Sequence, residues 1–469
     1  MAKEKKEKKE ISYPVYDATQ LGSAQLFILG AQHMFAMFGA TVLVPALTGL
    51  SVSTTLFFAG IGTLLFHLIS KGKVPAFLGS SFAFLAGYAA IAPNGEKELL
   101  PYACFGVACA GLLYLILAGL FKAFGTENVM RFFPPIVTGP IIIAIGLTLS
   151  QSAIDNCSAN WFIAVVAILI IVICNIYGKG MIKIIPIILG VLGSTFVAFV
   201  LNITMGGNND DFVLFDPVKV QAIKDAAWLG WPIKYQETVF SIFSDCDVKL
   251  LVSAIITIVP IALATIVEHI GDISAISSTV GKDFIKDPGL HRTLTGDGIA
   301  TTVASIFGAP ANTTYGENTG VLSLSKVYDP RVIRIAAGFA LIFSFSPKVA
   351  ACISAIPTAV IGGISLVLYG MISAVGVRNI VENKVDFSKT RNVIIAALIL
   401  VLSIGIKYSA DGGINILIGS MTISFSGLAV GSIVGIIMNA VLPDEDFRAK
   451  RAAKKQIGEK SEKEEKTEE

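Results

Sequence analysis

The chain has 469 residues, of which 54% are hydrophobic and only 15% are charged, and its mean hydropathy is +0.73. Because about a quarter of the residues in soluble globular proteins are charged, this composition excludes an ordinary soluble domain and indicates an all-α polytopic membrane protein. The net charge of +2 says little by itself, and we expect a lipid bilayer rather than a nucleic acid as partner.

The two ends of the chain are rich in charge. The first residues, MAKEKKEKKE, have no apolar stretch directly behind their lysines, so they do not form a cleavable signal peptide. We expect residues 1–20 to be a solvated cytoplasmic tail. Residues 443–469 mix both charges and carry little apolar surface, which predicts a disordered cytoplasmic tail.

Apolar runs near the length of a membrane helix, about 20 residues, recur along the chain. Twelve such runs lie near residues 22–44, 51–70, 100–121, 132–151, 160–178, 182–203, 250–279, 293–308, 332–354, 356–377, 392–407 and 414–441. Two further apolar stretches, 77–90 and 312–325, are too short or too broken for ordinary helices. Counting both predicts fourteen transmembrane segments.

The positions of the basic residues test this count. With the N-terminus inside and fourteen crossings, most of the 36 Lys and Arg residues fall on the cytoplasmic side, as the positive-inside rule requires. Omitting one short segment would invert every later loop, whereas omitting both inverts only the loops between them. Charge therefore favours fourteen spans in the cytoplasmic membrane with both termini cytoplasmic, and it leaves twelve open.

The longest outside segment, about 204–248, has a half-apolar composition that includes Trp228 and Trp231. Tryptophan is enriched at the membrane–water interface. We therefore expect an amphipathic piece that lies on the outer surface of the membrane.

The two short stretches resemble each other. Each opens with Pro-Ala, at Pro75 and Pro310, and continues through small and hydroxyl residues. They stand third and tenth among fourteen segments, so the chain divides into two halves of seven spans with opposite orientation. Paired, interrupted segments in an inverted repeat indicate the binding site of a transporter. We expect each to be a short strand followed by a half-helix, buried in protein or lining a polar cavity.

Three acidic residues fall inside apolar segments. Glu268 and Asp272 are four residues apart and share one helical face, and Glu317 lies in the second short stretch. An ionisable residue at membrane depth costs at least about 2.5 kcal/mol, so these acids indicate function. The bland alternative is a protonated acid that hydrogen-bonds between helices. Two neighbouring carboxyl groups tend to share a proton, which favours proton coupling, and carboxylates accept the N–H groups of a neutral planar substrate.

Other motifs add no further chemistry. We expect His33, beside Gln32 in the first span, to brace the helix bundle near the site. The sequence has no HExxH, GxSxG, CxxC or GxxxxGK[ST] motif. No catalytic residue, metal or cofactor is expected, and the chain is not expected to be an enzyme.

Five segments occur in the order QHMFAMFGATVLVP, PAFLGSSFAF, VEHIGD, KDPGLHR and NTTYGENTGV. Together they resemble the nucleobase–ascorbate transporter family, and within it the bacterial uracil permeases most closely. The most specific motif of the family contains Gln or Glu, then Asn, Gly, Thr and a basic residue or Gly. This chain matches it with Glu317, Asn318, Gly320, Ser325 and Lys326, so Ser replaces the usual Thr.

The resemblance implies a core domain (21–130 and 248–355) beside a gate domain (131–247 and 356–442), which would also form the contact of a homodimer. It implies that Glu268 and Glu317 hydrogen-bond the base, and that the backbones around Phe82 and Gly316 add contacts. The other residues it places at the site are Ser81, Asn318, Tyr315 and Tyr369, the two tyrosines as apolar or stacking walls.

Substrate and coupling ion stay open at this point. The relatives that transport uracil often have His where this chain has Asp272, and purine-transporting members often have Asp there but Gln in place of Glu317. We therefore expect proton-coupled uptake of uracil by alternating access, with Glu268, Asp272 and Glu317 in proton coupling. The alternatives are xanthine or uric acid as substrate and sodium as the coupling ion. An anion transporter of the same layout and a membrane-embedded hydrolase are the competing classes.

Overall fold

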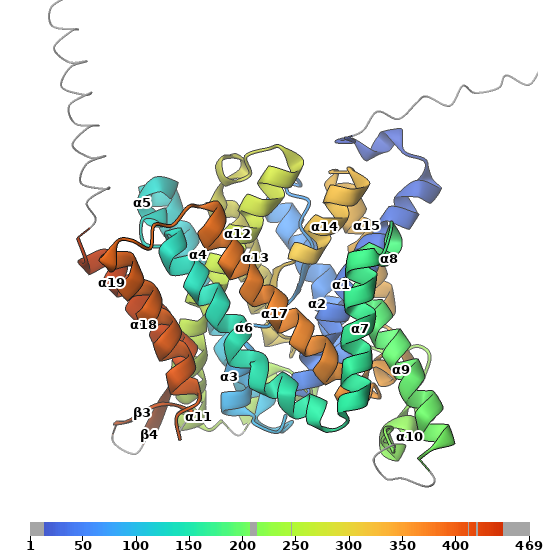
Figure 1. Cartoon of the computed structure of the whole chain (residues 1–469). Helices are drawn as coiled ribbons and strands as arrows, with labels where there is room; N and C mark the ends of the chain where they lie inside the picture. Colours follow the sequence, from blue (N-terminus) through green and yellow to red (C-terminus); the bar gives the residue numbers. More distant parts are fainter. Residues whose placement is uncertain (1–13, 207–212, 245, 411, 419–420, 444–469) are drawn as a thin grey trace, which may run out of the picture.

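The computed structural model describes residues 14–206, 213–244, 246–410, 412–418 and 421–443, and it is mostly helical (Figure 1). The longer helices are α1 (Ser23–Thr48), α2 (Val52–Ile69), α4 (Leu100–Phe124), α6 (Pro135–Ser158), α7 (Trp161–Tyr177), α9 (Pro186–Thr204), α11 (Val248–Ile258), α12 (Ala262–Val280), α13 (Leu290–Ile306), α15 (Pro330–Ser344), α17 (Thr358–Glu382), α18 (Thr390–Lys407) and α19 (Gly427–Val441). The shorter ones are α3 (Leu85–Ile91), α5 (Thr126–Met130), α8 (Met181–Ile184), α10 (Pro217–Asp225), α14 (Gly316–Ser325) and α16 (Pro347–Ser354). Tight 3₁₀ turns lie at η1 (Ala18–Gln20), η3 (Tyr235–Glu237), η4 (Val239–Ser244) and η5 (Val259–Ile261), and a wider π-type turn lies at η6 (Ile285–Gly289).

Local signals explain where several helices begin and end. The side-chain oxygens of Asn160, Asp247 and Ser426 accept hydrogen bonds from the free amides that begin α7, α11 and α19. Gly49 and Gly281 end α1 and α12 in the left-handed conformation, with φ of 81° and 73°, which costs glycine no side-chain clash.

Many of the helices are long enough to span a membrane. Among the described residues, eight helices are long and apolar enough to cross a membrane, with 248–280 counted as one. The pair α15 and α16 would make nine if it counts as one span, although it bends by 87°. The chain is therefore an integral multi-pass membrane protein.

The helices pack in two groups. In the first, α13 packs on α4 and α2, and α15 packs on α1 and α2. In the second, α6 packs on α17 and α18, and α7 packs on α9 and α17. The groups meet where α12 contacts α6 and α19 and where α1 contacts α9.

Glycines allow the closest helix pairs in both groups. A Cβ on Gly111 of α4 would lie 2.8 Å from the carbonyl oxygen of Gly298 on α13, and the reverse distance is also 2.8 Å. Gly139 of α6 and Gly376 of α17 make the same kind of approach, at 3.1 and 2.7 Å. Such small residues let membrane helices gain backbone packing that bulkier side chains would prevent.

The last predicted span, 414–441, is only partly helical. Strands β3 (Gly413–Ile418) and β4 (Met421–Ser426) pair as an antiparallel hairpin, and only α19 continues as a helix. Isoleucine recurs through this stretch, and β-branched residues pack well in strands. The expectation of an apolar helix over its first half is wrong because apolar composition alone suits a strand equally well.

The outer segment, expected to include an amphipathic piece, contains the short helix α10 and the turns η3 and η4. Helix α10 has no buried residue, and residues 207–212 lie outside the described residues. Trp228 and Trp231 are 76% and 68% exposed, as suits a membrane–water interface. They still contact the protein, because Lys348 lies over the Trp228 ring at 5.3 Å and Trp231 meets Phe345 edge-on.

The N-terminal segment differs from the solvated tail expected for residues 1–20. Residues 1–13 lie outside the described residues, whereas Val15 and Ala18 are buried against the helix bundle. The C-terminal tail expected at 443–469 lies outside the described residues except for residue 443.

Candidate functional site

The two short stretches meet at the centre of the molecule. Strand β1 (Leu78–Ser80) pairs antiparallel with β2 (Asn312–Thr314), with Leu78 opposite Thr314. Two more backbone hydrogen bonds extend this ladder at its ends. Helix α3 follows β1 and helix α14 follows β2. Both strands are buried, and their pairing satisfies backbone groups that neither lipid nor water would reach.

Side chains of the surrounding helices hold this ladder. The Leu78 amide donates to the Thr63 hydroxyl of α2 at 2.9 Å, and the Asn312 side-chain amide donates to the Phe58 carbonyl at 3.0 Å. On the other side, the Thr301 hydroxyl of α13 donates to the Asn312 carbonyl at 2.8 Å. Two long helices therefore fix the irregular backbone in place.

Tyr315 closes the ladder next to Gly79. Its hydroxyl donates to the Ser80 carbonyl at 2.8 Å and accepts from Thr41 of α1 at 3.3 Å. A Cβ on Gly79 would lie 2.5 Å from the Tyr315 ring. The ring thus occupies space that only glycine leaves free at this position of β1.

The three acidic residues predicted to be functional line one cavity. Glu268 and Asp272 lie one turn apart on α12, and Glu317 is the second residue of α14. The Thr314 hydroxyl donates to Oδ2 of Asp272 at 2.8 Å, so β2 orients this carboxyl group. Gly316 brings the backbone of α14 close, because a Cβ there would lie 4.0 Å from Oδ1 of Asp272.

The cavity has a volume of about 840 Å³, within the range of small-molecule sites. Its inner end is lined by Phe82, Tyr315 and the acids, and α17 supplies apolar residues such as Leu368. Its other end is lined by Arg378, Glu382 and Asn383, which are exposed and mark the mouth. The walls therefore come from both helix groups.

One carboxylate oxygen in this cavity is unpaired. Oε2 of Glu268 is buried and has no hydrogen-bond partner in the described part of the chain. A buried acceptor without a partner costs free energy. It is therefore suited to receive a hydrogen bond from a ligand that carries N–H groups.

Three residues predicted for the site do not line the cavity. The Asn318 side-chain amide points back to α1, 3.0 Å from the His33 carbonyl and 3.1 Å from Nδ1 of the same histidine. Tyr369 packs edge-on behind the ring of Phe82, with 6.1 Å between ring centroids. Ser81 is fully buried.

The remaining two predicted residues lie on α1. His33 is fully buried and contacts Asn318, as expected for a residue that braces the bundle, and Gln32 is half-buried beside it.

Sequence reasoning missed a buried histidine–aspartate contact behind the acids. Nδ1 of His269 lies 2.8 Å from Oδ2 of Asp297 on α13, and both side chains are fully buried. One turn earlier, Tyr114 of α4 donates to the Thr265 hydroxyl at 2.5 Å. These contacts fix the face of α12 that points away from the cavity. A lone aspartate within the apolar stretch 293–308 was the available signal.

Known proteins are similar to this chain in sequence or in fold. A family model described as "Permease family" matches residues 24–412. The chain is similar to the uracil permease of Bacillus subtilis (strain 168), with 38% identity over 93% of this chain and 96% of that one. It is also similar to the uracil permease of Escherichia coli (strain K12), with 37% identity over 89% and 91%.

A solved structure extends the comparison to the fold. The transmembrane domain of the cyanobacterial bicarbonate transporter BicA matches with a TM-score of 0.56 over 89% of this chain and 97% of that chain, at 15% identity. At this identity the match concerns the fold alone. The sequence matches and the multi-pass architecture together show that the chain is a permease rather than an enzyme, and that it belongs to the nucleobase–ascorbate transporter family.

Proposed function

We propose that the protein is a secondary active transporter that takes up uracil together with a proton across the cytoplasmic membrane. The observation that carries this proposal is the unpaired Glu268 oxygen in a cavity that Glu317 also lines. Relatives named uracil permease support the substrate, because they match over most of their length and of this chain.

Uracil has the chemistry that this cavity would bind. The base is planar and neutral, with two N–H donors and two carbonyl acceptors. Glu268 and Glu317 accept from the donors. Tyr315, the N-cap of α14, makes no side-chain cap bond, and the first amides of a helix, which have no partner within it, suit a carbonyl oxygen of the base. Phe82 and Tyr315 provide the apolar walls.

The proton is carried by the carboxyl groups of α12. Glu268 and Asp272 face the same cavity one turn apart, and two carboxylates at this spacing do not readily both ionise in a site that excludes water. Thr314 holds Asp272 in place. Release of the base and rehydration of the cavity then favour release of the shared proton.

Alternating access follows from the two helix groups. The first group, with α12 packed on its α4 and α14 packed on its α1, carries the acids and the strand pair, and the second contributes α17 as the opposite wall. Rocking of the second group, the gate, against the first would move the mouth of the cavity from one side of the membrane to the other. With both termini cytoplasmic, the present mouth faces the cytoplasm. The gate is also the surface proposed for a homodimer.

The test is uptake of radiolabelled uracil into proteoliposomes with and without an inward proton gradient, in sodium-free buffer and then with added sodium. Gradient-driven uptake that sodium leaves unchanged supports the proposal. Uptake that requires sodium and does not respond to the proton gradient overturns the assignment of the proton as the coupling ion. Asp272→Asn in the same assay assigns the proton, because gradient-driven uptake that persists in this variant removes Asp272 from the coupling step.

A purine substrate is the second candidate, and Asp272 is the observation that favours it. Excess unlabelled xanthine or uric acid distinguishes the two in the same vesicles. Competition by uracil alone supports the pyrimidine, whereas transport of xanthine in place of uracil supports the purine.

A further inference from the structure

Residues 14–21 form a strap across the ends of two helices that carry the acids. Val15 forms a parallel bridge with Val327 just after α14. Its amide donates to the Lys326 carbonyl at 2.9 Å, and its carbonyl accepts from the Tyr328 amide at 2.8 Å. The strap is thus hydrogen-bonded to the turn that ends α14.

Tyr16 connects the strap to α12. Its hydroxyl donates to the carbonyl of Val280, the last residue of α12, at 2.8 Å. Its ring meets Tyr328 edge-on with 5.5 Å between centroids, and the Lys282 ammonium lies 4.6 Å from the ring centroid. One side chain therefore touches the segments that follow both α12 and α14.

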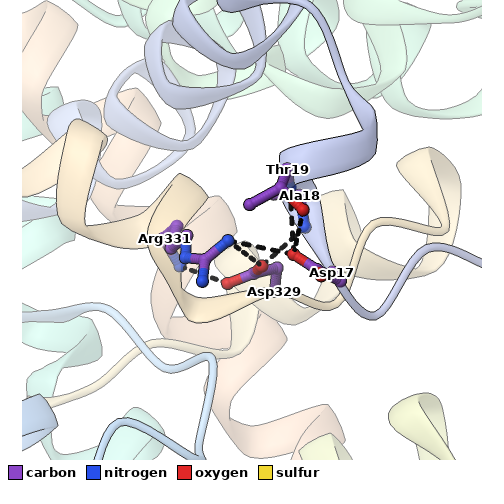
Figure 2. Close-up of polar contacts among 5 residues, drawn as sticks. All are labelled: Asp17, Ala18, Thr19, Asp329 and Arg331. Atoms are coloured by element: carbon purple, nitrogen blue, oxygen red, sulfur yellow. Dashed lines mark hydrogen bonds and ion pairs between the residues drawn. The ribbon is translucent and has the colours of Figure 1, made fainter.

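A polar cluster holds the next residues of the strap (Figure 2). The Ala18 amide donates to Oδ2 of Asp329 at 2.6 Å, and Arg331 donates to the Asp17 carboxylate at 2.9 Å. Asp329 also caps α15 by accepting from the Arg331 amide. Figure 2 shows both aspartates pointing toward Arg331.

The underside of the strap is apolar. Val15, Ala18 and Leu21 are buried in a small cluster whose other buried members are Leu29, Val327 and Val332. The strap is therefore part of the folded protein, held by apolar burial as well as by hydrogen bonds.

The strap holds the ends of the two helices that carry the carboxyl groups. Helix α14 has only ten residues, and its first end is fixed by the strand pair. Asp272 and Glu317 each stand eight residues before the end of their helix, about 12 Å at 1.5 Å per residue. A shift of either helix end would move these carboxyl groups, since a short helix moves as a rigid rod.

We propose that the strap is a positioning element that fixes the ends of α12 and α14 relative to each other, with Tyr16 as its central residue. This inference rests on the proposed function, because its effect is exerted on Glu317, which binds the base, and on Asp272, which shares the proton. A strap that only stabilised the fold would leave the affinity for substrate unchanged.

The test compares Tyr16→Ala, Tyr16→Phe and the control Asp287→Asn. The control removes a surface ion pair, Lys73 with Asp287, that makes no contact with the strap among those described. We expect Tyr16→Phe to raise the KM for uracil about threefold to tenfold, the range that loss of one hydrogen bond produces, with Vmax nearly unchanged. Tyr16→Ala also loses the ring contacts with Tyr328 and Lys282 and should raise the KM further, and Asp287→Asn should match wild type.

Hydrogen exchange of residues 316–325 is measured on the same purified proteins without substrate. Faster exchange there in Tyr16→Phe than in Asp287→Asn is the expected result. An unchanged KM in both Tyr16 variants, even with a lower melting temperature, overturns the proposal. If wild type takes up no uracil, the proposed function fails, and unchanged exchange in 316–325 is then the result that overturns the strap.

Discussion

The two short stretches, 77–90 and 312–325, have similar backbones and different chemistry. Both place a three-residue strand before a short helix, and the strands pair with each other. The first stretch contributes Phe82 to the cavity and no ionisable side chain, whereas the second contributes Glu317 and the Thr314 hydroxyl that holds Asp272. The strand-and-helix geometry occurs in both stretches, but only the second supplies polar side chains to the cavity.

This difference predicts unequal sensitivity to mutation. Glu317→Gln should reduce uracil uptake by about tenfold to a hundredfold, because hydrogen bonds to charged groups contribute about 1.5–3 kcal/mol and the new amide N–H₂ faces a donor of the base. Phe82→Leu in the first stretch should cost only about 1 kcal/mol of apolar contact. Initial uptake rates with equal amounts of protein check both. Equal losses would show that the two stretches contribute alike.

Alanine at a glycine of each stretch should affect stability in opposite directions, with the loss in the first stretch. Gly79→Ala in the first stretch should destabilise the protein by about 1–3 kcal/mol through overpacking, because its Cβ would lie 2.5 Å from the Tyr315 ring. Gly320→Ala in the second stretch meets nothing within 4 Å and should stabilise α14 by up to about 1 kcal/mol. Melting temperatures of the two variants in detergent test both predictions. A Gly79→Ala variant as stable as wild type would mean that the Tyr315 ring can move.

Removal of the Thr314 hydroxyl in the second stretch should have a smaller effect on uptake. Thr314→Val removes the hydrogen bond to Asp272 and should weaken proton-driven uptake by about threefold to tenfold. Thr314→Ser keeps a hydroxyl at the same position and serves as the control. A deficit of equal size in both variants would assign the effect to the shape of the side chain instead of its hydrogen bond.

The strap should show no pH dependence of its own. The Thr19 amide and hydroxyl donate to the Asp17 carboxylate, and together with Arg331 they hold its pKa below the ordinary value of 3.8. A lowered pKa means that the contribution of Asp17 is present above the ordinary value and is lost only as the pH falls through the lowered one. Asp17→Asn should therefore change uptake by the same factor at about pH 5.5 and about pH 7.5. A factor that differs between the two would mean that Asp17 titrates in this range.

Sequence patterns predicted much of this architecture. Long apolar runs placed α1, α2, α4 and α7 within a few residues of their observed ends. The cost of an acid in an apolar segment singled out the three carboxyl groups that the structure brings to one cavity.

The missed features depend on contacts between distant segments. The pairing of His269 with Asp297 depends on how α12 packs against α13, and no local pattern encodes that packing. The hairpin at 413–426 has the apolar composition of a helix. The strap is covered by residues more than 300 positions later in the chain. In the sequence it closely follows the charged residues MAKEKKEKKE, so it was predicted to belong to the same solvated tail.

The strand pair has a consequence for how the protein is made. Ser80 and Tyr315, which close it, are 235 residues apart in the chain. A ribosome releases the first strand long before its partner exists, so β1 waits in the membrane with unpaired backbone groups while the intervening helices are inserted. The transport site is thus among the last features to form during biogenesis, and a chain interrupted between the halves should insert its early helices yet lack a site until the second half is supplied.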